Sequence, residues 1–481
     1  MTQRDAFLII DIGTGNVRVA LTTTDGEILS IERDNVHYTS DPLYPDALHF
    51  EPDALWDQIV KLTRAAVQRV PDTRTIAVTV SSQREGIVLL DASGRSLIGL
   101  PNHDRRGREW EHEVAEKSRI YKITGRFPSW LFSAMKVIGI RKKRPEIYNK
   151  LQTIVSISDW AQFQLSGVAG YEHSQASETQ LYDVEKKSWS NELCSLFNLP
   201  ERILPALHSS GTILGKVLPE VARDLSISED AVVVVGGADT QLAIKSTAPA
   251  VDDIVIVSGT TTPIAKIVPN YVYDVKERTW TNRHVDKDNF ILEANAGVTG
   301  LNYQRLKEIF YPNEGYDVIE KELATSSDDV CVASLGSLVA DEKQPLTKGG
   351  FFFDAPVSHQ LTRAGFVRAT LWDIACAIKD NYDALTDVTP HQTNYVWACG
   401  GGFQSTMLTQ NIADLIQKNV RIRSGYRQAS VSGGVAVCSE ALKLQHHSNG
   451  SYDVVAPRNE KTTAAQYEEW RKTRSNLRKI F

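Results

Sequence analysis

The chain lacks the features that mark secreted, membrane-bound and nucleic-acid-binding proteins. Its 481 residues include only five cysteines, with no Cys-x-x-Cys pair, which argues against a disulfide framework or zinc site and fits a reducing cytosol. No apolar run approaches the roughly 18 residues of a membrane span, and no signal peptide is evident. Lys and Arg number 53 against 59 Asp and Glu, whereas duplex binding needs a basic excess. We therefore expect a cytoplasmic globular protein without a membrane or nucleic-acid partner.

Proline-rich linkers and low-complexity tracts are also missing, so the domains must be found from repeated patterns. At about 100–200 residues each, the length allows about two to four domains. An apolar strand at residues 7–10 runs into an acidic glycine turn at 11–16. A similar strand and acid recur at residues 232–239, and a second strand with a Gly-Thr turn follows at 254–262. This repetition predicts duplicated α/β halves, which we divide into residues 1–245 and 246–481.

The glycine turns are candidate phosphate-binding loops. Small residues after a strand leave backbone N–H groups free to approach phosphate, as at residues 13–16 and 258–262. Asp11, beside the first turn, can hold a water of hydrated Mg²⁺. An ordinary hairpin turn is the alternative. Neither loop matches the P-loop or the Rossmann fingerprint, and the three glycines at 400–402 serve either a ligand or close helix packing.

Asp239 follows the apolar and glycine-rich residues 232–238. A carboxylate at the end of a buried strand, near a phosphate site, can take the proton of an alcohol as it attacks phosphorus. A helix N-cap is the alternative for this residue. We also expect a helix at residues 52–66 and an amphipathic terminal helix at 462–481 that packs onto the body.

Polar residues follow two further predicted strands. Gln83, Arg84 and Glu85 lie between apolar strands at 75–80 and 87–90, where an amide, a fork of donors and an acceptor suit a polyhydroxylated ligand. Asp104 lies in a second polar segment after a strand. A solvated turn with a local ion pair remains the alternative for the first segment.

Taken in order, these segments resemble the FGGY carbohydrate kinases of the actin, Hsp70 and hexokinase superfamily. The resemblance extends from Phe7 to about Arg471, and its landmarks are Asp11-x-Gly-Thr-Gly, Gln83-Arg84-Glu85, Asp104-x-Arg106, Ser158-Asp159-Trp160, Gly237-x-Asp239-x-Gln241, Gly259-Thr260-Thr261, Thr299-Gly300, Gly400-Gly401-Gly402 and Gln410-x-x-Ala413-Asp414. It implies an α/β fold of two ribonuclease H-like domains flanking a catalytic cleft. ATP would be held mainly by the second domain, and a small acceptor would lie against the first.

The resemblance also implies roles for individual residues. Asp239 matches the catalytic base, and Asp11 and Asp239 would lie at the Mg²⁺ site. The nucleotide-binding positions would be Thr14, Gly259, Thr260, Thr261, Gly300, Gln304, Gly401, Gly402 and Ser405. The acceptor-binding positions would be Gln83, Arg84, Glu85, Asp104 and Asp239.

Departures from the family bear on the acceptor. Many sugar kinases of the family have Met-His-Gly where this chain has residues 84–86, whereas glycerol and autoinducer-2 kinases share Arg-Glu. Glycerol kinases resemble it less at Leu131 and Thr240, where they have tyrosine and glutamine. Gln428 replaces the glutamate that usually begins a late signature of the family. Residues 341–345 barely resemble the family's Gly-Glu-Arg-x-Pro segment. We expect phosphorylation of a small sugar, a polyol or an autoinducer-2-like linear acceptor, with glycerol or a ketopentose such as xylulose as alternatives.

A nucleotide-dependent regulatory module of the same superfamily is a competing hypothesis of another class. Such a module would hydrolyse ATP slowly and signal through its hinge. The polar set at residues 83–85 and Asp104 argues against it, because a module without an acceptor needs no such shell. An NAD-dependent dehydrogenase would need a glycine fingerprint that the chain lacks. The oligomeric state is left open, with a homodimer as one option.

Overall fold

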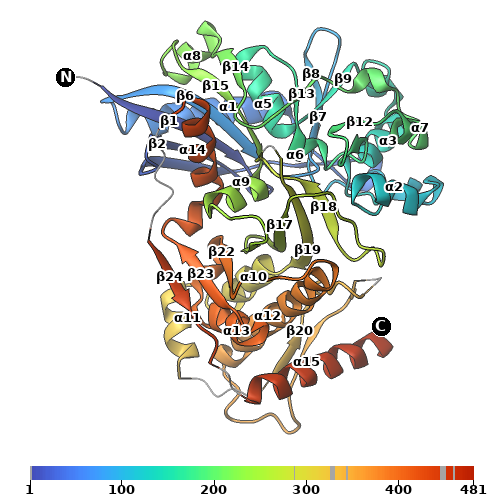
Figure 1. The fold of residues 1–481 in the computed structure, drawn as a ribbon, viewed down its shortest axis with the longest axis vertical. Helices are drawn as coiled ribbons and strands as arrows, with labels where there is room; N and C mark the ends of the chain where they lie inside the picture. Colours follow the sequence, from blue (N-terminus) through green and yellow to red (C-terminus); the bar gives the residue numbers. More distant parts are fainter. Residues whose placement is uncertain are drawn as a thin grey trace.

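The computed structural model describes residues 3–286, 288–325, 331–342, 345–444, 451–458 and 461–480. Figure 1 shows two sheets stacked along the long axis, the first built from early residues and the second from later ones. Within the described ranges, no helix combines the length and the apolar character needed to cross a membrane.

The first sheet has six strands in the order β14-β15-β6-β1-β2-β3. Their bounds are β1 (Arg4–Ile12), β2 (Asn16–Thr23), β3 (Ile28–Asn35), β6 (Thr73–Ser82), β14 (Ile213–Lys216) and β15 (Val232–Ala238). Strands β1 and β15 both pair in parallel with β6, and β1, β2 and β3 form an antiparallel meander. The register places Asp11 and Gly237 on either side of Ser81. The carboxyl ends of three buried strands therefore meet at one edge.

The second sheet has seven strands in the order β18-β19-β17-β16-β22-β23-β24. Their bounds are β16 (Ile254–Val257), β17 (Thr261–Val268), β18 (Trp280–Arg283), β19 (Phe290–Val298), β22 (Tyr395–Cys399), β23 (Asn419–Arg423) and β24 (Tyr452–Val455). Strand β16 pairs antiparallel with β17 and parallel with β22, which is parallel to β23. This arrangement repeats that of β1 with β2, β6 and β15, so the duplication predicted from the sequence is present.

The remaining strands form smaller sheets, and helices cover the two large ones. The strands are β4 (Thr39–Asp41), β5 (Tyr44–His49), β7 (Ile87–Leu90), β8 (Ser96–Leu100), β9 (Thr153–Ser156), β10 (Tyr171–Glu172), β11 (Tyr182–Asp183), β12 (Ser188–Trp189), β13 (Leu207–His208), β20 (Val332–Ser334) and β21 (Gly350–Phe352). The helices are α1 (Pro52–Gln68), α2 (Lys117–Thr124), α3 (Ser133–Lys143), α4 (Pro145–Tyr148), α5 (Ile157–Ser166), α6 (His173–Ala176), α7 (Asn191–Leu196), α8 (Pro219–Leu225), α9 (Asp239–Ser246), α10 (Gly300–Phe310), α11 (Tyr316–Leu323), α12 (Arg363–Val388), α13 (Thr406–Ile416), α14 (Ala429–Ala441) and α15 (Lys461–Ile480).

The two predicted helices form where periodicity placed them. In α1, Pro52 begins the helix and the buried Leu55, Ile59 and Leu62 line one face. Helix α15 packs onto the body through the fully buried Trp470, whose indole N–H donates to Asp373 Oδ1 at 2.8 Å. Both predictions are confirmed over the described residues.

Helix α14 belongs to the late part of the chain but packs on the first sheet, as Figure 1 shows in red beside the blue strands. Its Val431 and Val435 share a buried cluster with Ile9 of β1 and Leu242 of α9. A Cβ atom on Gly433 would lie 1.9 Å from the carbonyl oxygen of Leu242, so only glycine permits this approach of α14 to α9. The division at residue 245 stays a prediction, because this helix joins the later residues to the earlier sheet.

Candidate active site

Asp11 lies at the carboxyl end of β1 and is fully buried. Its Oδ1 accepts a hydrogen bond from Ser81 Oγ at 2.7 Å, and its Oδ2 accepts one from Ser430 Oγ at 2.9 Å. Arg18 forms an ion pair with the same carboxylate and also donates to Gln428 Oε1 at 2.9 Å. The departure from the family at Gln428 is therefore linked to Asp11 through one arginine, and α14 helps to hold this acid.

Asp239 is the first residue of α9, directly after β15. The N-cap of this helix is Ala238, so the alternative reading of Asp239 as an N-cap is wrong. The Asp239 Oδ1 accepts the backbone N–H of Thr240 at 2.6 Å. Burial and the negative charge of Asp11 raise the pKa of Asp239 to about 7. This carboxylate is half-buried and more basic than a free aspartate, as a base working near neutral pH must be.

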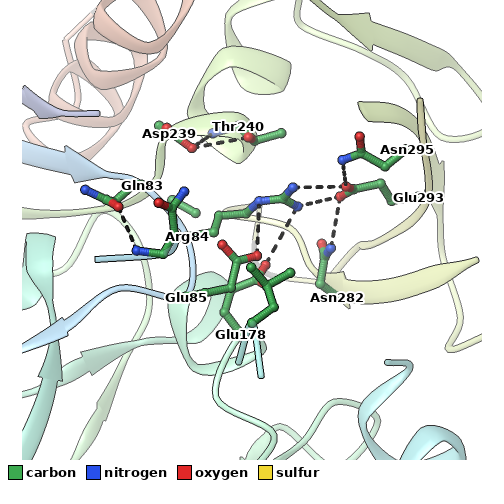
Figure 2. A network of polar contacts seen from close by, with 12 residues as sticks. Gln83, Arg84, Glu85, Glu178, Asp239, Thr240, Asn282, Glu293 and Asn295 are labelled. Carbon is green, nitrogen blue, oxygen red and sulfur yellow. Dashed lines mark hydrogen bonds and ion pairs between the residues drawn. The ribbon is translucent and has the colours of Figure 1, made fainter. Parts of the chain in front are cut away.

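Arg84 extends from the end of β6 into a network of carboxylates (Figure 2). Its Nη1 and Nη2 contact Oε2 and Oε1 of Glu293, on β19, at 2.6 and 3.1 Å. Glu178 Oε1 lies 3.8 Å from Nη1, and Glu85 Oε1 lies 3.9 Å from Nε. Burial opposes ionisation of Glu293, but Arg84 keeps its pKa below the ordinary value. The alternative of a solvated turn is wrong, because Arg84 is buried and its main partner comes from the other sheet.

Glu85 adopts an uncommon backbone conformation, with φ of 60°. A residue with a Cβ atom is strained there, and such strain is concentrated at functional sites. The Glu85 carbonyl oxygen accepts a hydrogen bond from Ser133 Oγ at 3.2 Å, which helps to hold the turn. The side chain of Glu85 is buried beside Arg84, so the sequence-predicted pair does lie together.

Gln83 and Asp104 are buried and make their polar contacts within the protein. Gln83 Oε1 accepts the backbone N–H of Asn102 at 2.9 Å, and its Nε2 donates to Tyr38 Oη at 3.2 Å. Asp104 accepts from the backbone N–H of Leu48 at 2.9 Å and from Arg106 Nε at 2.6 Å. Gln83 ties the end of β6 to the loop at Asn102, and Asp104 ties that loop to Leu48 of β5. Direct contact of either residue with a phosphoryl acceptor stays a prediction.

The predicted nucleotide loops converge at the carboxyl ends of β16 and β22. The backbone N–H of Gly402 donates to Ser258 O at 3.0 Å, and that of Thr299 donates to Thr260 O at 3.2 Å. A Cβ atom on Gly300 would lie 2.0 Å from Gly259 O. The loop at 258–262 is thus fixed between the triple glycine and the start of α10. Gly259, Thr260 and Gly401 are exposed, and the backbone N–H of Gly259 donates to Thr261 O at 3.0 Å.

Three other predicted nucleotide residues lie in different surroundings. Thr14 Oγ1 accepts from Asn102 Nδ2 at 2.8 Å, which places the tip of the first hairpin against the acceptor loop. Ser405 is buried and caps α13 by accepting the Leu408 N–H at 3.3 Å. Gln304 is exposed on α10 and donates to Glu308 Oε1 at 3.0 Å. Their contact with a nucleotide stays a prediction.

Several residues at the site were missed from the sequence. Glu293 carried a usable signal, because it is a lone charge in the apolar segment of β19. Arg126 and Glu178 carried none, since they lie in separate loops and meet only through an ion pair at 2.5 Å.

The chain matches the models of both domains of one protein family. Residues 6–245 match the N-terminal domain of the FGGY family of carbohydrate kinases, and residues 334–442 match its C-terminal domain. YoaC of Bacillus subtilis (strain 168), whose name describes it provisionally as a sugar kinase, is 48% identical over 98% of this chain and 97% of its own length. The autoinducer-2 kinase of Salmonella typhimurium (strain LT2) is 27% identical, over 64% of this chain and 59% of that protein.

Solved structures share the fold at lower sequence identity. Glycerol kinase of Plasmodium falciparum with ADP has a TM-score of 0.86 at 19% identity, over 98% of both chains. Ligand-bound xylulose kinase of Lactobacillus acidophilus has a TM-score of 0.83 at 16% identity, also over 98% of both. The expected fold of two ribonuclease H-like domains is confirmed. The chain belongs to the FGGY family of carbohydrate kinases and is an ATP-dependent kinase.

Proposed function

We propose that this kinase phosphorylates a hydroxyl of a small sugar, a polyol or an autoinducer-2-like linear acceptor, with Asp239 as the general base. The observation that supports this most is the position of Asp239. It follows a buried strand, and its pKa is raised to about 7 although the charge of Arg84 favours the ionised form. Figure 2 shows both residues in one view of the site. A base of this strength can accept the hydroxyl proton while phosphorus is attacked.

The surrounding residues supply orientation and charge. Arg84 and Glu85 offer donors and acceptors to the hydroxyls of the acceptor. The exposed backbone at Thr260 and Gly401 faces the place expected for the phosphates and the base of ATP. Burial of the network excludes water, which would otherwise compete as phosphoryl acceptor. Relatives that phosphorylate autoinducer-2 favour a linear acceptor, and glycerol and a ketopentose remain alternatives.

We expect ATP to bind together with Mg²⁺, and the carboxylates of the site fit a hydrated Mg²⁺ ion. No group of three or more metal-binding side chains occurs in the described part of the chain, but Mg²⁺ bound to a nucleotide needs only one or two carboxylates and keeps several waters. Both Asp11 oxygens already accept hydrogen bonds, so Asp11, together with Asp239, would hold the ion through water. Bound there, Mg²⁺ would neutralise charge on the phosphate oxygens.

A cytoplasmic setting belongs to the same proposal. All five cysteines are free thiols, and four of them are buried, as suits a reducing compartment. A homodimer remains open.

A coupled ADP-release screen tests the function. The panel covers tetritols, pentuloses, glycerol and 4,5-dihydroxy-2,3-pentanedione, with Asp239→Asn as the blank. We expect one acceptor class to stimulate ADP release strongly and the variant to lose about 10²–10⁴-fold in turnover while still binding ATP. Near-normal turnover of Asp239→Asn would remove the base from the mechanism. Slow ADP release that no acceptor stimulates would instead support the regulatory module.

A further inference from the structure

Buried side chains around the pair of Arg126 and Glu178 have polar atoms that lack hydrogen-bond partners. Within the described residues, this holds for Nε and Nη1 of Arg126, Oε2 of Glu178 and Oε1 of Gln180. The three side chains are 0%, 1% and 0% exposed. Each unpaired buried polar group costs roughly 1–3 kcal/mol, and native structures rarely keep them without a reason. Several in one place indicate that a polar ligand completes them.

These groups adjoin the acceptor side of the site. Arg126 Nη2 donates to Glu178 Oε1 at 2.5 Å, and this same oxygen lies 3.8 Å from Arg84 Nη1. Figure 2 shows Glu178 pointing toward Arg84. The Arg126 guanidinium lies 4.8 Å from the ring centre of Trp280 and 5.4 Å from that of Phe132. Two aromatic rings therefore fix its plane.

The hydrogen-bond donors and acceptors around Arg126 and Glu178 determine which ligand can bind beside them. An arginine only donates. Burial raises the pKa of Glu178 above its ordinary value, against the opposing charge of Arg126, so its carboxyl takes up a proton more readily than a free glutamate and can then also donate. Protonation of Glu178 leaves the charge of Arg126 without its nearest counter-charge. The donors of Arg126 match an oxygen with free lone pairs, best a carbonyl or carboxylate oxygen, whereas Gln180 Oε1 can only accept a hydrogen bond.

We propose that Arg126 and Glu178 form the far end of the acceptor site and select acceptors with a carbonyl or carboxylate oxygen away from the phosphorylated hydroxyl. The inference rests on the proposed kinase function and narrows its substrate class. Asp239 and Arg84 contact the end of the phosphoryl acceptor that reacts, whereas Arg126 and Glu178 bind its other end. Polyols, which lack such an oxygen, are then the poorer acceptors.

The test compares acceptors that differ at one group. Erythritol, erythrulose and erythronate form one matched set, and xylitol, xylulose and xylonate form another. For the set that the wild type turns over faster, kcat and KM are measured by ADP release. We expect the wild type to prefer the carbonyl or carboxylate member over the polyol by at least about tenfold. The ketose and aldonate arms show which of the two oxygens is preferred.

Variants assign this preference to the two residues. Arg126→Met and Glu178→Leu should each reduce it about 10–100-fold, through the acceptor KM and not kcat, because each removes a hydrogen bond to a charged or strongly polar group. Glu178→Gln keeps a donor of the same shape and should retain most of the preference. Arg421→Met is the matched control, since Arg421 also stacks on rings and has an unpaired buried Nε. It should leave the preference unchanged.

Each outcome has one meaning. A wild type that phosphorylates no acceptor refutes the proposed function. A wild type that phosphorylates polyols as well as their oxidised partners refutes only this inference, as does an equal loss on both acceptors in Arg126→Met. That pattern would leave buried water as the partner of these groups. If Arg126→Met does not fold, as thermal unfolding would show, the contrast between Glu178→Leu and Glu178→Gln decides.

Discussion

Arg84 and Glu293 form a two-pronged ion pair that joins the two large sheets. The residues are 209 positions apart, and their oxygens and nitrogens meet at 2.6 and 3.1 Å. Arg84 leaves the end of β6, whereas Glu293 is held in the middle of β19 between β17 and β18. The orientation of the acceptor-side arginine therefore depends on the position of the second sheet. Closure of the two halves would thus assemble part of the acceptor site.

Replacing Glu293 by glutamine should weaken acceptor binding more than ATP binding. Glutamine has the shape of glutamate but not its charge, so Arg84 would lose its main counter-charge. Loss of one partner of a buried ion pair costs about 3–5 kcal/mol of stability. We expect a lower melting temperature and a rise of roughly 10–100-fold in acceptor KM, measured by steady-state kinetics. Glu192→Gln is the control, because its bidentate pair with Arg119 is exposed and worth about 0–1 kcal/mol. An unchanged acceptor KM in Glu293→Gln would show that the pair is only structural.

The activity should depend on pH through Asp239. The base works only when ionised, and its pKa is raised to about 7. Below this value the proton is already present, so kcat/KM should fall about tenfold for each pH unit. Above it, kcat/KM should level off. Rates at pH 5.5–9 with a fixed excess of Mg-ATP measure this, and Asp239→Asn should lack the acidic limb. A profile that is flat down to pH 5.5 would argue against an aspartate with raised pKa as the base.

Alanine substitutions at Gly401 and Gly402 should distinguish a role in nucleotide binding from a role in folding. A Cβ atom on Gly401 would meet nothing within 4 Å, whereas one on Gly402 would lie 2.0 Å from Ser258 Oγ. Gly401→Ala should therefore fold normally but raise the ATP KM about tenfold, because the methyl group occupies the expected nucleotide surface. Gly402→Ala should lower the melting temperature as well. If Gly401→Ala binds ATP like the wild type, the triple glycine serves only packing.

Gly433 should be essential for stability. An alanine there would drive its Cβ to 1.9 Å from Leu242 O, forcing α14 away from α9. The expected cost is about 1–3 kcal/mol or more, seen as a lower midpoint in denaturant. Gly365→Ala is the matched control in helix α12, because its nearest neighbour is the flexible end of Leu361 at 3.3 Å. That change should be neutral or stabilising by up to about 1 kcal/mol. Equal effects of the two changes would contradict the close packing of α14.

Local patterns in the sequence predicted much of the fold. Alternating and apolar runs marked β1, β15 and β16, and the proline and apolar spacing of residues 52–66 marked α1. The glycine turns and Asp239 were recognisable because each is a short motif at the end of a strand. The place of α14 was not predictable, since its apolar residues do not say which sheet they will cover.

The sequence by itself determined the family, the repeated strand-and-acid pattern and the residues at strand ends, because these depend on neighbours in the chain. Only the tertiary structure decided that Arg84 pairs with Glu293, that Arg126 and Glu178 adjoin them, and that Gln428 reaches Asp11 through Arg18. Such contacts join segments that the register of two sheets and the packing of α14 bring together, and spacing along the chain carries no information about that distance in space.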